Sequence, residues 1–220
     1  MVVFDRVVSA DPFFRKYWLL HTLEEPKIDG ASAIVDAAQY GGQGRLTLDV
    51  LWPAAGTAQL SKVGGPGKEY EVFGTNYAND PDPARAERGS IETARWRIEL
   101  FPKSPAAEDL FLTVMQVTDR ANPARRAVQR IEADGRIGCT IESPSGPWMI
   151  LFRRDGGSSR DAAAFTIPGQ GKARILITDL EPGQWTARHE SGETREINVP
   201  AESGAAWVEG PAGKWTIRGR

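Results

Sequence analysis

Apolar and polar residues alternate along most of this chain, and that alternation constrains its fold more than any other feature. Residues 45–52 put their large apolar side chains on one face, and residues 95–100 repeat the pattern with charged residues outside. A period of two is typical of half-buried antiparallel strands. Residues 110–117 are apolar on both faces, which predicts a central strand. No segment carries a sustained apolar stripe at the 3.6-residue period of a helix.

Glycine- and proline-rich turns separate the apolar runs, so that strand candidates recur about every ten to fifteen residues. We therefore predict an all-β fold, an antiparallel β-sandwich with a second, smaller β-sandwich subdomain at the C-terminus. The arginine-rich stretch 119–135 marks a soft boundary between a main unit, 1–134, and a smaller one, 135–220. The predicted turns include Gly64–Gly67, Asp134-Gly135, Pro182-Gly183 and Pro211–Gly213.

In the second part, short apolar runs predict a series of brief strands. Leu180-Glu181-Pro182-Gly183-Gln184-Trp185 is similar to a corner seen in many sandwiches, where a buried aromatic ring follows a turn into a strand. The predicted strands are 137–142, 148–153, 163–167, 173–178, 185–189, 194–199, 205–209 and 214–218.

Composition excludes several classes of function. The 220 residues carry 27 basic and 29 acidic side chains, a formal net charge of −2, so neither a nucleic acid nor a membrane is an expected partner. One cysteine, Cys139, excludes an internal disulfide and a multi-cysteine zinc site. With only two histidines, His21 and His189, a histidine-rich metal centre is excluded as well.

Motifs for catalysis are weak. Gly64-Gly65-Pro66-Gly67-Lys68-Glu69 lacks the spacing and the hydroxyl residue of a phosphate-binding loop, and a hairpin turn is favoured. No Gly-x-Ser-x-Gly elbow is present. Asn79-Asp80-Pro81-Asp82 could attract calcium, but a solvated loop is the favoured interpretation. We expect no catalytic residue, no metal ion and no cofactor.

Single residues have a structural and a functional interpretation. For His21 a buried core histidine is favoured over a substrate contact, and His189, beside a turn, is predicted at the surface. Cys139 is predicted to be an inert core thiol. Trp52, Trp96 and Trp148 could stack on sugar rings, yet core positions are favoured. The arginines Arg120, Arg125, Arg126 and Arg130 could grip anionic groups, although a solvated loop is favoured.

Longer strings of the sequence resemble a known family. They are Val3–Val7, Lys16–Thr22, Glu25-Pro26, Gly64–Tyr70, Gly74–Tyr77, Trp96–Glu99, Glu108–Leu112 and the tail from Leu176 to Leu180 onward. In this order they resemble the C-terminal β region of heparinase II/III-like polysaccharide lyases. Such lyases join an α/α toroid to a β-sandwich region and cleave uronate-containing glycans by β-elimination.

The resemblance implies a domain that is not catalytic by itself. In the family, the catalytic Tyr and His come mostly from the toroid and from a His-x-His-x-Asp segment early in the β region, and neither is found in this chain. The expected function is to support the cleft for an acidic polysaccharide such as a glycosaminoglycan. The residues expected to contact substrate are His21, Lys68, Glu69, Asn76 and Tyr77, from the most family-like strings. The alternatives are a free-standing carbohydrate-binding module and, third, a small autonomous lyase that uses His21.

The first residues shape the expected partners. Met1–Val8 reads as the middle of a strand without the features of a signal peptide, so we expect a fragment of a longer lyase whose N-terminal catalytic region is missing. The apolar residues of that strand predict an exposed edge and a homodimer. By family resemblance the expected location is the periplasm or the cell exterior.

Overall fold

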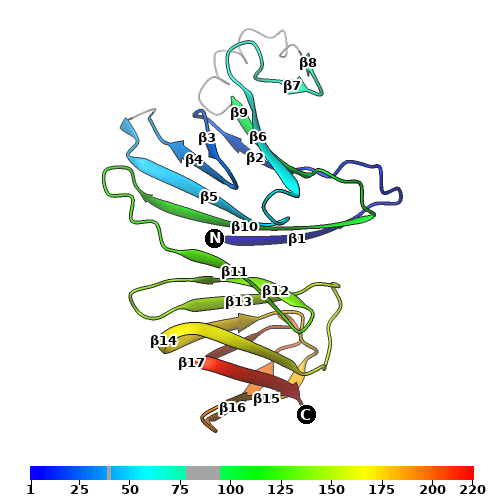
Figure 1. The fold of residues 1–220 in the computed structure, drawn as a ribbon, viewed down its shortest axis with the longest axis vertical. Coiled ribbons are helices and arrows are strands. Elements are labelled where there is room, and N and C mark those ends of the chain that lie inside the picture. The colour runs from blue at the N-terminus through cyan, green and yellow to red at the C-terminus, as the bar shows by residue number, and fades with distance from the viewer. Residues whose placement is uncertain (39–40, 78–94) are drawn as a thin grey trace. The chain divides into compact units, whose positions relative to one another are not determined.

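The computed structural model describes residues 1–38, 41–77 and 95–220, and these form two compact units, 1–125 and 126–220 (Figure 1). Strands and loops build both units, and no α-helix occurs among the described residues. No described helix could therefore cross a membrane. The predicted all-β class is confirmed. Strand β11, which lies before the expected boundary at residue 134, pairs with β12 inside the second unit.

The first unit is a sandwich of two antiparallel sheets. Its core contains Leu48, Ile98 and Met115, and Trp18 and Leu60 pack against them, so that both sheets contribute. The five-stranded sheet has the order β1 (Val2–Val8), β10 (Glu108–Asp119), β5 (Gly44–Trp52), β4 (Ser32–Asp36) and β3 (Lys27–Asp29). The three-stranded sheet has the order β2 (Trp18–Thr22), β9 (Trp96–Pro102) and β6 (Ala58–Gly64).

Strand β10 lies between β1 and β5, as its two apolar faces predict. Its residues 110–115 are all buried. Strand β1 is an edge strand that pairs with β10 through Val2–Val8. A small hairpin of β7 (Glu71–Val72) and β8 (Thr75–Asn76) follows β6.

The second unit is one open seven-stranded sheet that bends around its own core (Figure 1). One apolar cluster joins Met149 near the start of the unit to Ile197 near its end, which requires the sheet to bend over itself. One neighbouring pair, β13 with β14, is parallel. The order is β11 (Val128–Ala133), β12 (Arg136–Ile141), β13 (Trp148–Arg153), β14 (Ala163–Ile177), β17 (Ala206–Gly219), β15 (Gly183–His189) and β16 (Thr194–Val199).

Two long strands replace four of the short ones expected in this unit. Strands β14 and β17 stay paired across a kink, where the register moves from Ile167–Gly213 to Lys172–Pro211. The predicted turn at Pro211–Gly213 is therefore wrong, because these residues continue a strand instead of reversing the chain. Extra residues on β14 form a bulge, which bends both strands together.

Two indole rings fill the centre of this core. Trp185 is fully buried, and its Nε1 donates to the carbonyl of Glu181 at 2.9 Å, which confirms the predicted corner. Trp215 repeats the arrangement, since its Nε1 donates to the carbonyl of Pro211 at 2.9 Å. His189 packs against Trp215 with ring centroids 5.0 Å apart.

The prediction of His189 at the surface is wrong, because its ring is buried. Its Nδ1 lies 2.8 Å from Ser191 Oγ, and its Nε2 lies 3.2 Å from the carbonyl oxygen of Ala212. The neighbouring charges of Arg188 and Glu190 obscured the inward direction of the side chain.

Trp148, for which a core position was favoured, lies instead on the outer side of the sheet. It packs against Trp207 and Arg174 on the side of the sheet facing away from the core cluster.

Candidate functional site

The five expected contact residues all lie in the first unit, on the three-stranded sheet and on the segment that follows its strand β6. His21 lies on β2, and Lys68, Glu69, Asn76 and Tyr77 lie on the segment between β6 and the end of the β7–β8 hairpin. Glu69 is half-buried and the other four are exposed. Alternation along β9 turns Ile98 and Leu100 into the core, so their neighbours face outward.

His21 points away from the core, which contradicts the interpretation as a buried histidine. It shares its face with Tyr17, Leu19 and Leu23, as the alternation indicates, but Trp18 and Leu20 on the other face pack into the core. Both faces of this short strand are apolar, so the sequence could not show which one is buried.

Arg97 connects His21 to the hairpin. It is the cross-strand neighbour of His21, and its Nη2 donates to the carbonyl of Glu71 at 2.9 Å. The same guanidinium forms an ion pair with Glu99 at 2.6 Å, and both side chains are largely buried. On the hairpin itself, Asn76 Oδ1 accepts from the Tyr70 backbone N–H at 2.9 Å. Lys68 keeps an exposed ammonium 3.8 Å from Glu71.

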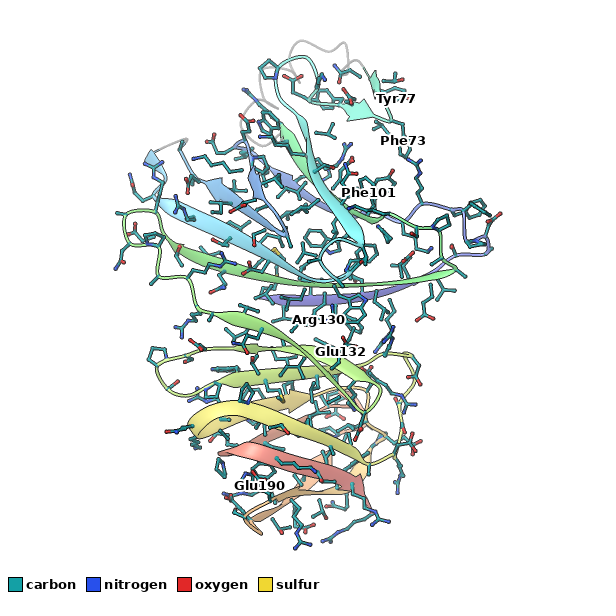
Figure 2. The ribbon with its side chains drawn as sticks, in the orientation of Figure 1. Phe73, Tyr77, Phe101, Arg130, Glu132 and Glu190 are labelled. Atoms are coloured by element: carbon teal, nitrogen blue, oxygen red, sulfur yellow. The ribbon has the colours of Figure 1, made fainter. Side chains whose placement is uncertain are left out.

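Aromatic rings extend this surface beyond the predicted residues. Tyr17 lies between Phe101 and Phe73, with ring centroids 5.0 Å and 6.0 Å apart. Figure 2 labels Phe101 on the sheet, and Phe73 and Tyr77 on the hairpin. Phe73 is 82% exposed and Tyr77 is 60% exposed. We call the surface formed by Tyr17, Leu19, His21, Phe73, Tyr77, Arg97, Glu99 and Phe101 the aromatic face.

Phe73 occupies a backbone conformation that its side chain disfavours. Its φ is +50°, and the following residue, Gly74, has a φ of +84°. Residues other than Gly, Asn and Asp rarely adopt this left-handed backbone region, and such backbone strain concentrates at functional sites. The turn therefore holds a large apolar ring in solvent at an energetic cost.

The Gly64–Gly67 string has a structural explanation. A Cβ at Gly64 would lie 2.2 Å from the Arg95 carbonyl oxygen, and a Cβ at Gly65 would lie 2.8 Å from the Trp96 ring. The two glycines allow the chain to pass close to β9 before it enters the hairpin. This supports the turn that the sequence favoured over a phosphate-binding loop.

Two members of the arginine cluster pair with carboxylates of their own units. Arg125 forms an ion pair with Asp49 in the first unit, whereas Arg130 forms one with Glu132 in the second. Within the described ranges, no group of three or more acidic, histidine or cysteine side chains could hold a metal ion. The candidate calcium loop, 79–82, lies outside the described residues. Burial raises the pKa of Cys139 to about 12, in agreement with an inert thiol.

Sequence reasoning missed the rings of Tyr17, Phe73 and Phe101, and the Arg97–Glu99 ion pair, as parts of the aromatic face. The alternation did place both charged residues outside, and it gave Tyr17 and His21 a common face. The sequence carries no sign that Phe73 is exposed, because nothing in the string Val-Phe-Gly-Thr distinguishes an exposed ring from a buried one.

Comparison with known families finds a match in the second unit. Residues 130–219 match the model of the heparinase II C-terminal domain. The second unit is similar to that domain. The match confirms the resemblance to the C-terminal region of heparinase II/III-like lyases. No curated protein matches the chain.

The heparinase II C-terminal domain match covers nearly all of the bent seven-stranded sheet, including both indole corners. It contains the Leu176–Leu180 string and none of the five expected contact residues, which all lie in the first unit. The chain thus carries one unit that is similar to the heparinase II C-terminal domain and another, the sandwich of residues 1–125, that holds the aromatic face.

Proposed function

We propose that this chain is the accessory β region of a heparinase II/III-like polysaccharide lyase, and that its aromatic face supports the cleft for uronate-containing glycans. The family match at residues 130–219 supports the assignment to such a lyase. The observation that carries the glycan contact is Phe73, an exposed ring held at a φ of +50° beside Tyr17. Aromatic rings present flat apolar surfaces on which the C–H faces of sugars can stack.

The polar groups of the aromatic face suit the rest of such a ligand. The Lys68 ammonium is exposed and loosely paired, so it is available to a uronate carboxylate. Arg97 is held in place by Glu99 and by the Glu71 carbonyl, which fixes the surface beneath the rings. His21 and Tyr77 offer ring nitrogen and hydroxyl groups to sugar hydroxyls.

In this proposal the β-elimination itself is carried out by the catalytic region of the parent lyase. β-Elimination needs a group that neutralises the carboxylate, a base for the C5 proton and an acid for the leaving oxygen. In this proposal the partners are an acidic polysaccharide and that catalytic region, in the periplasm or outside the cell. The edge strand β1 is proposed to join two copies, which light scattering over a range of concentrations tests.

Binding of acidic oligosaccharides tests the proposal. Heparin, chondroitin, hyaluronan and alginate oligosaccharides are titrated into the whole chain by calorimetry at low salt. At least one should bind, and Phe73→Ala and Tyr77→Ala should each weaken it. Val117→Ala, which removes an exposed side chain from the other sheet, serves as the control. Unchanged affinity in both aromatic variants, or no heat with any acidic glycan, would reject the aromatic face as a glycan surface.

A free-standing carbohydrate-binding module is the second candidate, because the exposed rings need no catalytic partner to bind a sugar. It predicts the same binding without any effect on a lyase toroid added to the mixture. The third candidate, a small autonomous lyase, predicts an unsaturated product with ultraviolet absorbance that disappears in His21→Ala. The accessory assignment predicts no such product from the chain alone.

A further inference from the structure

We infer that the second unit holds a separate binding groove for an uncharged sugar residue. A hollow of about 610 Å³ opens where the ends of β11 and β12 meet the loop 142–147 and the bend 168–172. That volume lies in the range of small-molecule sites. The groove belongs to the second unit alone, so it is independent of the aromatic face and of the function proposed for it.

The chemistry of the lining selects the class of ligand. Amide and hydroxyl groups come from Gln129, Thr140, Ser143, Ser145 and Gln170, and apart from prolines no aliphatic or aromatic side chain is among the residues that line this groove. Such groups both donate and accept, which matches the hydroxyl groups of a sugar. Three prolines, at positions 144, 147 and 168, offer ring C–H surfaces to the apolar side of a pyranose.

Charge argues against a sulfated or uronate ligand here. The lining carries one carboxylate, Glu142, and one ammonium, Lys172. Lys172 is already paired with Glu209, and Glu209 also accepts from Arg174 at 3.3 Å. The groove therefore has no surplus of positive charge, and Glu142 would repel an anion that entered it.

The walls are tied together before a ligand arrives. A Cβ at Gly146 would lie 1.7 Å from the Lys172 carbonyl oxygen, so the loop touches the bend directly. The Arg174 backbone N–H donates to the Pro147 carbonyl at 3.0 Å, and Arg174 Nη1 donates to Ser145 Oγ at 2.9 Å. A site that is already formed loses less conformational entropy on binding.

Chemical-shift mapping on the whole chain tests this inference. Neutral oligosaccharides of glucose, galactose, mannose, xylose and N-acetylglucosamine, together with uronate and sulfated ones, are titrated into the isotope-labelled protein. At least one neutral sugar should shift the amides of 142–147 and 168–172. Gln170→Ala should weaken that binding at least fivefold, because its exposed amide lines the groove without supporting the fold.

Controls separate this groove from the aromatic face. Glu202→Ala, an exposed change in the same unit, and Val117→Ala, an exposed change on the other unit outside the aromatic face, should leave neutral-sugar binding unchanged. Shifts confined to residues 71–77, a groove that takes only anionic sugars, or no shift with any neutral sugar would each overturn the inference. Groove shifts that persist while acidic glycans fail to bind would retain it and reject the proposed function.

Discussion

At the scale of single residues, the aromatic face depends on a ring held in a disfavoured conformation. Phe73 has a φ of +50° and is mostly exposed, so its ring gains little from burial in the free chain. The arrangement makes sense if the ring contacts something that the chain binds. Stability and binding should then respond to a change at this position with opposite signs.

The first prediction concerns Phe73→Asn. Asparagine tolerates the left-handed region, in which an ordinary side chain costs about 1 kcal/mol. We expect the free energy of unfolding in urea to stay level or to rise by up to about 1 kcal/mol, while affinity for acidic glycans falls. Val72→Asn, at a neighbouring exposed position without positive φ, is the control. A loss of stability only in the Phe73 variant would show that the ring serves packing instead.

The second prediction compares the two histidines. His189→Ala removes a buried ring packed against Trp215 and leaves the Ala212 carbonyl without its partner, so it should lower the free energy of unfolding by about 2–4 kcal/mol. His21→Ala, at an exposed position, should change it by no more than about 0.5 kcal/mol. Equal effects in a urea titration would contradict the burial of His189.

The third prediction uses the single cysteine as a pH probe. The pKa of Cys139 rises from an ordinary value of 9.0 to about 12, because burial disfavours the thiolate. Between these values the folded chain holds a proton that the unfolded chain has lost. Its stabilising contribution is therefore complete below pH 9 and falls by about 1.4 kcal/mol per pH unit above it.

The comparison with Cys139→Ala isolates this effect from the other groups that titrate in alkali. The free energy of unfolding, measured at several values between pH 8 and 11, should decrease more steeply in the parent chain than in the variant. A thiol reagent should also react slowly with the folded chain at pH 8. Parallel pH profiles, or rapid labelling, would mean that the thiol is accessible.

At the scale of elements, the sequence predicted most strands and missed how two pairs of them join. The alternation placed β12, β13, β15 and β16 within a few residues of their bounds, because each is a short run with one buried face. It divided β14 and β17 in two, because proline and glycine at their kinks are typical of turns. The pairing of Ile167 with Gly213 and of Lys172 with Pro211 shows that both strands continue past the kink.

The candidate site was predictable only in part for a similar reason. Family-like strings located the hairpin residues, and the alternation placed Arg97 on an outward position, whereas His21 was expected in the core. Which sheet covers which, and hence which rings remain exposed, depends on packing between strands that are distant in sequence. Tyr17 meets Phe73 and Phe101 only after the sandwich has formed.

The fourth prediction tests the kink of β14 and β17. A Cβ at Gly210 would lie 2.3 Å from the buried Trp215 ring, so Gly210→Ala should lower the free energy of unfolding by about 2–3 kcal/mol. Gly157→Ala, in the same unit with open space around it, should be neutral or slightly stabilising. A Gly210 variant as stable as its parent would show that the ring can move aside.

At the scale of the whole molecule, the chain consists of two units with separate cores. The core cluster of the second unit draws only on residues from 131 to 217, and the core cluster of the first draws only on residues from 3 to 115. Strand β11, the first after the boundary in sequence, is an edge strand of its own sheet. Two cores of this kind should unfold as two units.

The fifth prediction is that residues 126–220 fold without the first unit. Expressed alone, this segment should give a β-type circular dichroism spectrum and a cooperative urea transition. Residues 1–125 should do the same in a separate preparation. A segment 126–220 that stays unfolded, while the whole chain melts in one transition, would show that the second core depends on the first unit.

The two indole corners have a consequence for spectroscopy. Trp185 and Trp215 are fully buried in the core of the second unit, and the N–H of each donates to a carbonyl four residues earlier in the chain. Fluorescence from such rings is emitted at short wavelength and is poorly quenched by dissolved iodide. Trp207, on the same unit, is exposed and open to the quencher. One chain therefore contains an internal reporter of core melting together with a surface reporter of its environment, and the two can be followed in the same cuvette.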